Sequence, residues 1–451
     1  MPIQSRRQMM RSLVAGSLLF PAILNDLLAS EENPLAPRAP HFPGKAKRVI
    51  FLYMTGGVSH LDSFDPKPKL MAEGGKPTSN KPGAAHYLPP QWAFQRGGKC
   101  GTEVSDLFPH IRECMDDICL IRSMRGDHQD HFQATLGIHT GSVTFARPSI
   151  GSWVSYGLGT ENQNLPSFVA LAPALPYAGT QVFSSDFLPG AHAGTRVVPG
   201  AEPIPDLIRR SPTEKIQALE LGLLDRFNRK HQQLQPTNPM LAARMKSFET
   251  AAGMQMAMPD VLDLSRETDA TLGLYGLERG SSKGFAWQCL VARRLAERGV
   301  RFVELIDVGS HDNWDAHSDI ATHAPLAKNV DQAIAGLLKD LKSRGMLDDT
   351  LVVWTTEFGR TPHTDGPKGR SHHNRAFSSW LAGGGVKGGI AYGKTDDFGA
   401  AVAEDAVHVH DFHATILHSL GFDHERLTFR HAGRDFRLTD VSGQVVKAIL
   451  A

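Results

Sequence analysis

Short, nearly continuous apolar runs alternate along the chain with segments whose apolar residues recur every three to four positions. The runs have the length and composition of strands that are buried on both faces of a sheet. They are residues 48–54, 118–121, 168–171, 302–306, 351–354 and 377–381. Strands that alternate with helices predict an α/β fold, with a mainly parallel sheet flanked by helices on both faces.

Helical periodicity is concentrated in residues 205–300. Residues 215–235, 241–252 and 285–298 carry apolar side chains at helical spacing, and Gly299 provides a C-terminal stop for the last of them. We expect this block to be a mostly helical insertion within one domain that spans residues 47–451. Later in the chain, amphipathic helices are predicted around residues 330–341 and 411–420.

The N-terminal segment has the pattern of an export signal. Arg6 and Arg7 precede an apolar stretch over residues 13–28, which is typical of a twin-arginine signal within residues 1–30. A short membrane anchor and an amphipathic helix are the alternatives. Residues 31–46, rich in Pro and Ala, are predicted as a linker. The apolar stretch is short for a spanning helix, so we expect a mature protein without a membrane span, in the periplasm or at the cell surface.

Charge and cysteine content narrow the function classes. With 48 Lys and Arg residues against 47 Asp and Glu, the chain offers no electrostatic reason to expect nucleic acid as a partner. The sequence does not indicate an oligomeric state. In an exported protein Cys100 could pair with Cys114 or Cys119, but the sequence does not choose between them. Structural disulfides or buried thiols, Cys289 included, are expected rather than catalysis.

Four short motifs combine histidine with acidic residues, and the first two lie in the N-terminal third. His60 and Asp62 follow the first apolar run and could bind metal or substrate; a polar turn is the alternative. Residues 127–131 contain two His and two Asp. On a helix over residues 127–140, positions 127, 130 and 131 share a face, which suits a ligand set ending at His131. Helix capping and surface charge are the alternatives.

The third motif follows the strand predicted at residues 302–306. Asp315 and His317 are separated by one residue, so in an extended backbone their side chains point to the same side. We expect ligand or acid–base duty here, with His311 and Asp312 as alternative members. The competing interpretation is a hydrogen-bonded loop packed around Trp314.

The fourth motif comes directly after the apolar run at 351–354. Glu357 and Arg360 follow this run, a polar Gly- and Pro-containing loop comes next, and His372 and His373 precede the run at 377–381. Ligands gather where strands of an open α/β sheet end. Arg360 could bind an oxyanion, or form a salt bridge to a loop carboxylate.

Taken together, the four motifs predict a metal-assisted hydrolase of an anionic ester. Carboxylates and imidazoles suit zinc, manganese, magnesium or calcium. One ion of this group is the expected cofactor.

Several longer segments resemble one bacterial family, known as domain of unknown function 1501, over nearly the whole chain after residue 45. They are residues 51–68, 147–159, 354–362, 371–389 and 410–440. That family is similar to sulfatases and alkaline phosphatases, so the resemblance implies their α/β fold and a site with one or two metal ions.

The resemblance also implies a diverged site. The Ser, Thr or Cys nucleophile of the superfamily starts a helix that closes with Thr-Gly, and counting back from Thr140 and Gly141 places His131 there. Glu357, Phe358 and Gly359 stand where relatives carry Asp-His-Gly. His131 and Arg360 are therefore the expected catalytic residues. The expected metal ligands are His60, Asp62, Asp315, His317, Glu357, His372 and His373.

The function expected from these observations is an exported, metal-dependent hydrolase of sulfate or phosphate esters that lacks the usual nucleophile. The alternative is a non-catalytic protein that binds anionic glycans or a cell-surface partner.

Overall fold

The computed structural model describes residues 33–207, 209–235 and 239–451. The export signal predicted at residues 1–30 lies outside the described residues. Residues 33–46 pack on the domain, where Arg38 Nη1 donates to the Tyr156 carbonyl at 2.7 Å and the Phe42 amide donates to the Gly421 carbonyl at 3.1 Å.

A nine-stranded sheet forms the centre of the described chain, in the order β12-β4-β11-β8-β1-β7-β5-β6, with β15 pairing with β4. Its strands are β1 (Arg48–Tyr53), β4 (Ile118–Arg125), β5 (Phe168–Leu171), β6 (Thr195–Val197), β7 (Phe302–Ile306), β8 (Thr350–Thr355), β11 (Phe377–Ala382), β12 (Ile390–Tyr392) and β15 (Val407–His408). Only β11 runs antiparallel, against both β4 and β8. The predicted strands and the mainly parallel sheet are confirmed.

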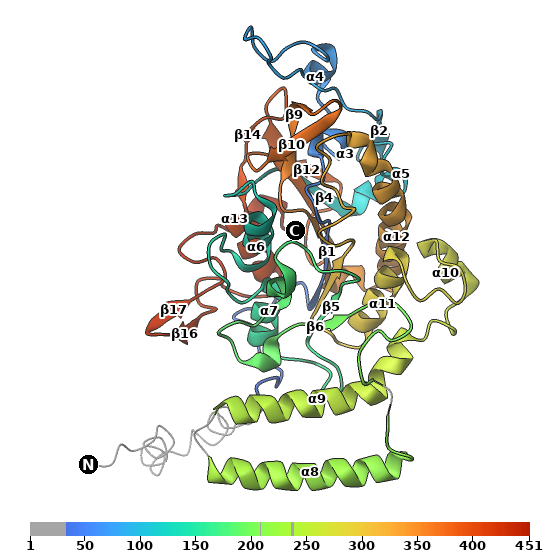
Figure 1. The fold of residues 1–451 in the computed structure, drawn as a ribbon, viewed down its shortest axis with the longest axis vertical. Helices are drawn as coiled ribbons and strands as arrows, with labels where there is room; N and C mark the ends of the chain where they lie inside the picture. Colours follow the sequence, from blue (N-terminus) through green and yellow to red (C-terminus); the bar gives the residue numbers. More distant parts are fainter. Residues whose placement is uncertain (1–32, 208, 236–238) are drawn as a thin grey trace.

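Helices cover both faces of this sheet (Figure 1). Successive side chains of a strand point to opposite faces, and Ile50 and Leu52 of β1 accordingly belong to one core while Val49 and Phe51 belong to the other. The first core is closed by α11 (Phe285–Glu297) and α12 (His323–Ser343), and the second by α6 (His131–Thr140), α7 (Ile150–Leu158) and α13 (Val409–Ser419). The helices predicted in these regions are confirmed.

Two long helices extend from this body. They are α8 (Glu214–Leu234) and α9 (Pro239–Leu262), and α8 is the outer one, with α9 between it and the sheet (Figure 1). Both correspond to predicted helices. In the described part of the chain, no helix combines the length and the apolar composition that crossing a bilayer requires.

Two expectations need correction, and one open alternative is decided. The polar loop expected after Arg360 is a hairpin of β9 (Gly359–Asp365) and β10 (Gly369–His373), whose turn uses Gly366 at φ +64°. The helix expected over 127–140 begins only at His131, because the Asp130 side chain accepts a hydrogen bond from the Phe132 amide and caps it there. Of the two expected states of the cysteines, disulfides or buried thiols, the structure has thiols: all four are free, Cys100 is exposed and the other three are buried.

Candidate metal centre

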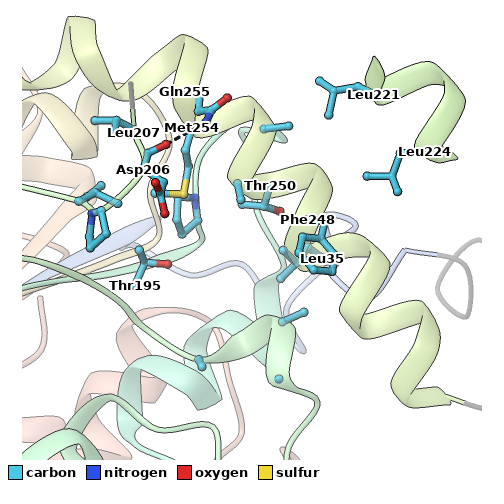
Figure 2. Close-up of a pocket in the computed structure, with 18 residues that line it drawn as sticks. Leu35, Thr195, Asp206, Leu207, Leu221, Leu224, Phe248, Thr250, Met254 and Gln255 are labelled. Carbon is cyan, nitrogen blue, oxygen red and sulfur yellow. Dashed lines mark hydrogen bonds between the residues drawn. The ribbon is translucent and has the colours of Figure 1, made fainter. Parts of the chain in front are cut away.

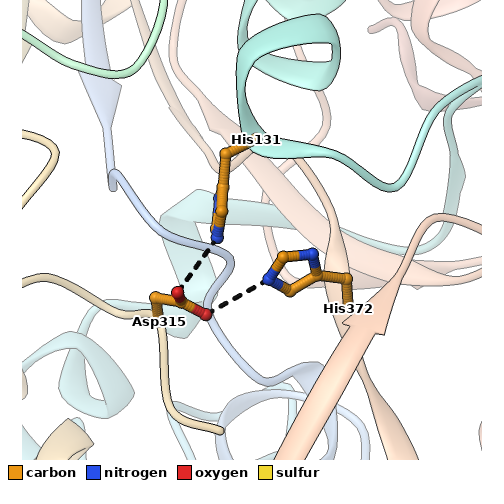
Figure 3. Close-up of side chains that lie close together, drawn as sticks. All are labelled: His131, Asp315 and His372. Atoms are coloured by element: carbon orange, nitrogen blue, oxygen red, sulfur yellow. Dashed lines mark hydrogen bonds and ion pairs between the residues drawn. The ribbon is translucent and has the colours of Figure 1, made fainter.

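Three predicted side chains from distant parts of the chain converge at one edge of the sheet. His131 is the first residue of α6, Asp315 lies in the loop after β7, and His372 is on β10. One potential ligand atom from each lies within 4.8 Å of the others (Figure 3). Within the described residues, no other set of His, Cys, Asp and Glu side chains converges in this way.

The Asp315 carboxylate is the meeting point of the cluster. His131 Nε2 lies 3.3 Å from Asp315 Oδ2, and His372 Nε2 lies 3.2 Å from Oδ1. A fourth side chain, His317, brings its Nε2 to 3.0 Å from Oδ1 and to 2.8 Å from His372 Nε2. Asp315 and His317, predicted to point to the same side, therefore do so.

Each of the three histidines uses its other ring nitrogen to bind an acceptor. His131 Nδ1 donates to Glu357 Oε1 at 2.8 Å, and His317 Nδ1 donates to Asp365 Oδ2 at 2.7 Å. His372 Nδ1 donates to the carbonyl of Gln129 at 2.7 Å. Because these partners accept hydrogen bonds, each neutral ring carries its hydrogen on Nδ1 and presents the Nε2 lone pair to the cluster.

This arrangement suits a bound cation. His131 Nε2 is buried and has no hydrogen-bond partner, and an orphaned buried polar atom is costly. The Nε2 lone pairs of His317 and His372 face each other, with the two nitrogens 2.8 Å apart. A proton or a cation between them removes the repulsion of the two lone pairs. Imidazole nitrogens with one carboxylate form a donor set that favours zinc-like ions over the oxygen-preferring Ca²⁺ and Mg²⁺.

Charge in the cluster is set by the close pairs. Burial alone would raise the pKa of the Asp315 carboxyl, but the nearby His131 and His372 rings and the Arg360 guanidinium hold this pKa well below its usual range. Burial raises the pKa of Glu357, and the hydrogen bond from His131 lowers it. The net result is a pKa below the ordinary value. Burial lowers the pKa of His131, but the carboxylates of Asp315 and Glu357 have the larger effect, so this pKa lies above its ordinary value.

Arg360 holds Asp315 in place and does not reach the open side of the cluster. Its side chain is fully buried. Its Nη2 donates to Asp315 Oδ1 at 2.8 Å. The same guanidinium also donates to the backbone carbonyls of Gly56, Gly57, Trp314 and Arg370. This is the salt bridge to a loop carboxylate that the sequence left open as the alternative to oxyanion binding.

Aromatic rings fix the orientation of the histidines on the inner side. The Tyr177 ring stacks on His131 at a centroid distance of 4.1 Å, and Phe358 contacts both His131 and His372. Side-chain exposure rises from 10% for His131 to 26% for Asp315 and 41% for His317. The cluster is therefore open to solvent on the side of His317.

Three predicted ligands lie outside the cluster. Asp62 is buried in a short helix, α3 (His60–Ser63), where Arg370 Nε donates to its Oδ2 at 2.7 Å. His60 and His373 face each other, with ring centroids 6.3 Å apart, and donate to the carbonyls of Gly399 and Ala400. Glu357, also predicted as a ligand, joins the cluster through His131 instead.

The surroundings of the cluster include residues that the sequence did not single out. Asp365 and the Gln129 carbonyl orient histidines, and Tyr53 and Tyr177 contact Glu357 and His131. Asp365 could have been found from the sequence because it lies between Glu357 and His372. Nothing in the sequence pointed to Gln129, Tyr53 or Tyr177. Of the alternative members of the third motif, His311 is exposed and Asp312 occupies a left-handed backbone conformation at φ +51°.

Comparison with known families gives one match. The sequence profile of the family described as "Protein of unknown function (DUF1501)" matches residues 46–450. No curated protein matches the chain.

Several solved structures are similar in fold. The lipoteichoic acid synthase LtaP from Listeria monocytogenes is 8% identical, with 91% of this chain and 80% of that one covered and a TM-score of 0.36. The PsFucS1 sulfatase from Pseudoalteromonas sp. is 13% identical, with coverage of 94% and 73% and a TM-score of 0.34. The phosphonate monoester hydrolase SpPMH from Silicibacter pomeroyi is 11% identical, with coverage of 70% and 68% and a TM-score of 0.32.

Proposed function

The chain belongs to the DUF1501 family, as its sequence motifs predicted, and we propose that it is an exported metal-dependent hydrolase of sulfate or phosphate esters. The observation that carries the metal centre is the common orientation of three histidines. Each commits Nδ1 to an acceptor and turns Nε2 toward Asp315. This is the arrangement that orients imidazoles for a metal ion.

His131, Asp315 and His372 are the proposed ligands. Three protein ligands leave a coordination position open for water or substrate, as in catalytic zinc sites. When bound, such an ion would polarise an ester oxygen and lower the pKa of a water molecule. Glu357 holds the His131 ring, the Gln129 carbonyl holds the His372 ring, and Arg360 holds the Asp315 carboxylate.

His317 and Asp365 form a second functional unit at the open side. Asp365 accepts from His317 Nδ1 at 2.7 Å, which leaves Nε2 directed at the cluster. Both side chains are 41% exposed. We propose that His317 takes up and returns a proton, with Asp365 orienting its ring.

The substrate class and the export rest on sequence. The ester class follows from the resemblance to a family that is similar to sulfatases and alkaline phosphatases, and export follows from Arg6, Arg7 and the apolar segment after them.

Metal content of the purified protein tests the proposal directly. We expect a bound zinc-like ion, and stabilisation of the chelator-treated protein when zinc or manganese is added. His372→Ala should weaken metal binding by more than the roughly 100-fold that loss of an outer partner costs. His373→Ala is the matched control, because its ring donates to Ala400 and not to the cluster. No bound metal and no stabilisation by zinc, manganese or calcium would refute the metal centre.

A panel of aryl sulfates and phosphate mono- and diesters separates the enzyme from its rival, a non-catalytic protein that binds anionic glycans. One observation favours the rival: the Arg360 guanidinium is buried and donates to Asp315 and to backbone carbonyls, so it does not reach a ligand. Turnover that is lost in His131→Ala supports the hydrolase. Binding of the anionic compounds without turnover supports the rival.

A further inference from the structure

Helix α8 carries an exposed apolar stripe along its whole length. Its members recur at intervals of three, four and seven residues and so share one face. They are Ile216, 40% exposed, Leu219, 67%, Leu223, 56%, Phe227, 62%, and Leu234, 75%. None of the residues of α8 is buried. A contiguous exposed apolar surface of this kind marks an interaction site.

Within the described part of the chain, the stripe does not face the body of the protein. A different side of α8 looks toward α9: Leu221 and Leu224 line a cavity of about 460 Å³ between the two helices and the body (Figure 2). Gln217, on the same side, donates to Gln255 Oε1 of α9 at 2.5 Å. Because α8 is the outer helix (Figure 1), the stripe points away from the domain.

The charges of α8 are separated along its axis. Before Leu223 the helix has two acidic residues and one basic residue, a net charge of −1. After Leu223 it has one acidic and three basic residues, a net charge of +2. Two such helices in antiparallel orientation place the acidic half of each beside the basic half of the other.

We propose that the α8 stripe binds a second copy of this chain, with the two α8 helices antiparallel and Leu223 at the twofold axis. The central part of the stripe, Leu219, Leu223 and Phe227, is symmetric about this residue, as a twofold interface requires. Leu219, four residues before the axis, meets the partner's Phe227, four residues after it. Ile216 meets the aliphatic stem of the partner's Lys230, whose ammonium group stays in water.

The same charge pattern disfavours a membrane as the occupant. Helices that lie on an anionic bilayer carry Lys and Arg along the whole polar face. In α8 the basic residues are concentrated after Leu223, and Glu214 and Glu220 lie in the first half. A second copy brings the half of net charge −1 beside the half of net charge +2, whereas an anionic surface attracts one half and repels the other.

Cysteine crosslinking of the full chain tests the geometry. The exposed Cys100 is first replaced by Ser, since the other three thiols are buried. In this background Leu223→Cys should form a disulfide-linked dimer under mild oxidation, because its two copies meet at the axis. Ile216→Cys is the matched control: its two copies lie about 21 Å apart along the helix axis and should not crosslink. A mixture of Leu219→Cys and Phe227→Cys chains should crosslink to each other and not to themselves.

Sedimentation measures the association without a crosslink. Leu223→Glu should weaken the dimer at least tenfold, whereas Val441→Glu, at an 83% exposed position outside α8, should leave it unchanged. A monomer at all concentrations with no 223–223 crosslink overturns the proposal. Equal crosslinking at positions 216 and 223 overturns the antiparallel arrangement. Binding of a monomeric chain to vesicles of anionic lipid assigns the stripe to a membrane.

Discussion

The two carboxylate oxygens of Glu357 accept four hydrogen bonds in the interior of the protein. Oε1 accepts from His131 Nδ1 and from the Gly56 amide, both at 2.8 Å. Oε2 accepts from the Tyr53 hydroxyl at 2.9 Å and from the Thr356 hydroxyl at 3.1 Å. A carboxylate so fully satisfied keeps its charge although it is buried. It therefore fixes the tautomer and the ring orientation of His131.

Replacing Glu357 by Gln tests this role. The amide keeps the size of the side chain, and its oxygen can still accept from His131 Nδ1, but it removes the negative charge that makes this ring a stronger ligand. We expect metal affinity to fall by about 10- to 100-fold, the usual effect of losing an outer partner of a ligating histidine. Competition with a chelator measures the affinity.

Glu304→Gln is the matched control for this experiment. Glu304 is also buried, and its Oε1 accepts from His139 Nε2 at 2.8 Å. His139 does not belong to the cluster, because its Nδ1 donates to the Thr135 carbonyl. Both variants should lower the free energy of unfolding, and only Glu357→Gln should weaken metal binding. Equal metal affinity in the two variants would contradict the assigned role of Glu357.

At the scale of elements, the position of His372 depends on the contact between the β9–β10 hairpin and the loop after β7. The two segments meet at Gly369, where an added methyl group would lie 1.9 Å from the His317 carbonyl oxygen. The Arg370 amide next to it donates to the Ala316 carbonyl at 2.9 Å. The hairpin brings Asp365 and His372 to Asp315 and His317 through this close approach.

Gly369→Ala should push the hairpin and the loop apart. We expect a loss of about 1–3 kcal/mol in the free energy of unfolding, as in other overpacked sites, together with weaker metal binding. Gly273→Ala provides the comparison, because a methyl group there meets no atom within 4 Å. Denaturant unfolding and chelator competition measure the two effects. Unchanged metal affinity in a destabilised Gly369→Ala protein would separate the hairpin contact from the cluster.

At the scale of the whole molecule, buried neutral histidines make the fold sensitive to acid. Burial lowers the pKa values of His192, His323 and His413 to about 3. In the unfolded chain these groups take up protons near pH 6.5. Between these values the unfolded state binds more protons, so stability falls as the pH falls, by up to about 1.4 kcal/mol per pH unit for each histidine.

We therefore expect the melting temperature of chelator-treated protein to fall steadily between pH 6.5 and pH 4. His413→Gln should reduce that slope, because the amide can still donate to the Ile138 carbonyl, as the ring does, without titrating. His86→Gln, at an exposed position, should leave the slope unchanged. His131 acts in the opposite direction: its raised pKa gives stability that is present at low pH and is lost as the pH rises through that value. If the melting temperature depends on pH equally in the unsubstituted protein, His413→Gln and His86→Gln, this account is contradicted.

The sequence by itself determined the layers of the fold. The run at residues 48–54 is apolar at nearly every position, and only a strand with helices on both faces buries all of them. The end of α6 is also determined locally, because Gly141 adopts the left-handed conformation that terminates the helix. Histidine and acid motifs at strand ends also singled out His131, Asp315 and His372, among nine candidate site residues.

Only the tertiary structure decided which motif residues share a site. His372 and His373 are adjacent in sequence, but alternate residues of β10 point to opposite sides, so one ring meets Asp315 and the other meets Ala400. Asp62 lies 308 positions from Arg370, and the hairpin delivers that guanidinium to it. Side-chain chemistry is local and can be read along the chain. Convergence depends on the register and packing of elements hundreds of residues apart, which no local pattern encodes.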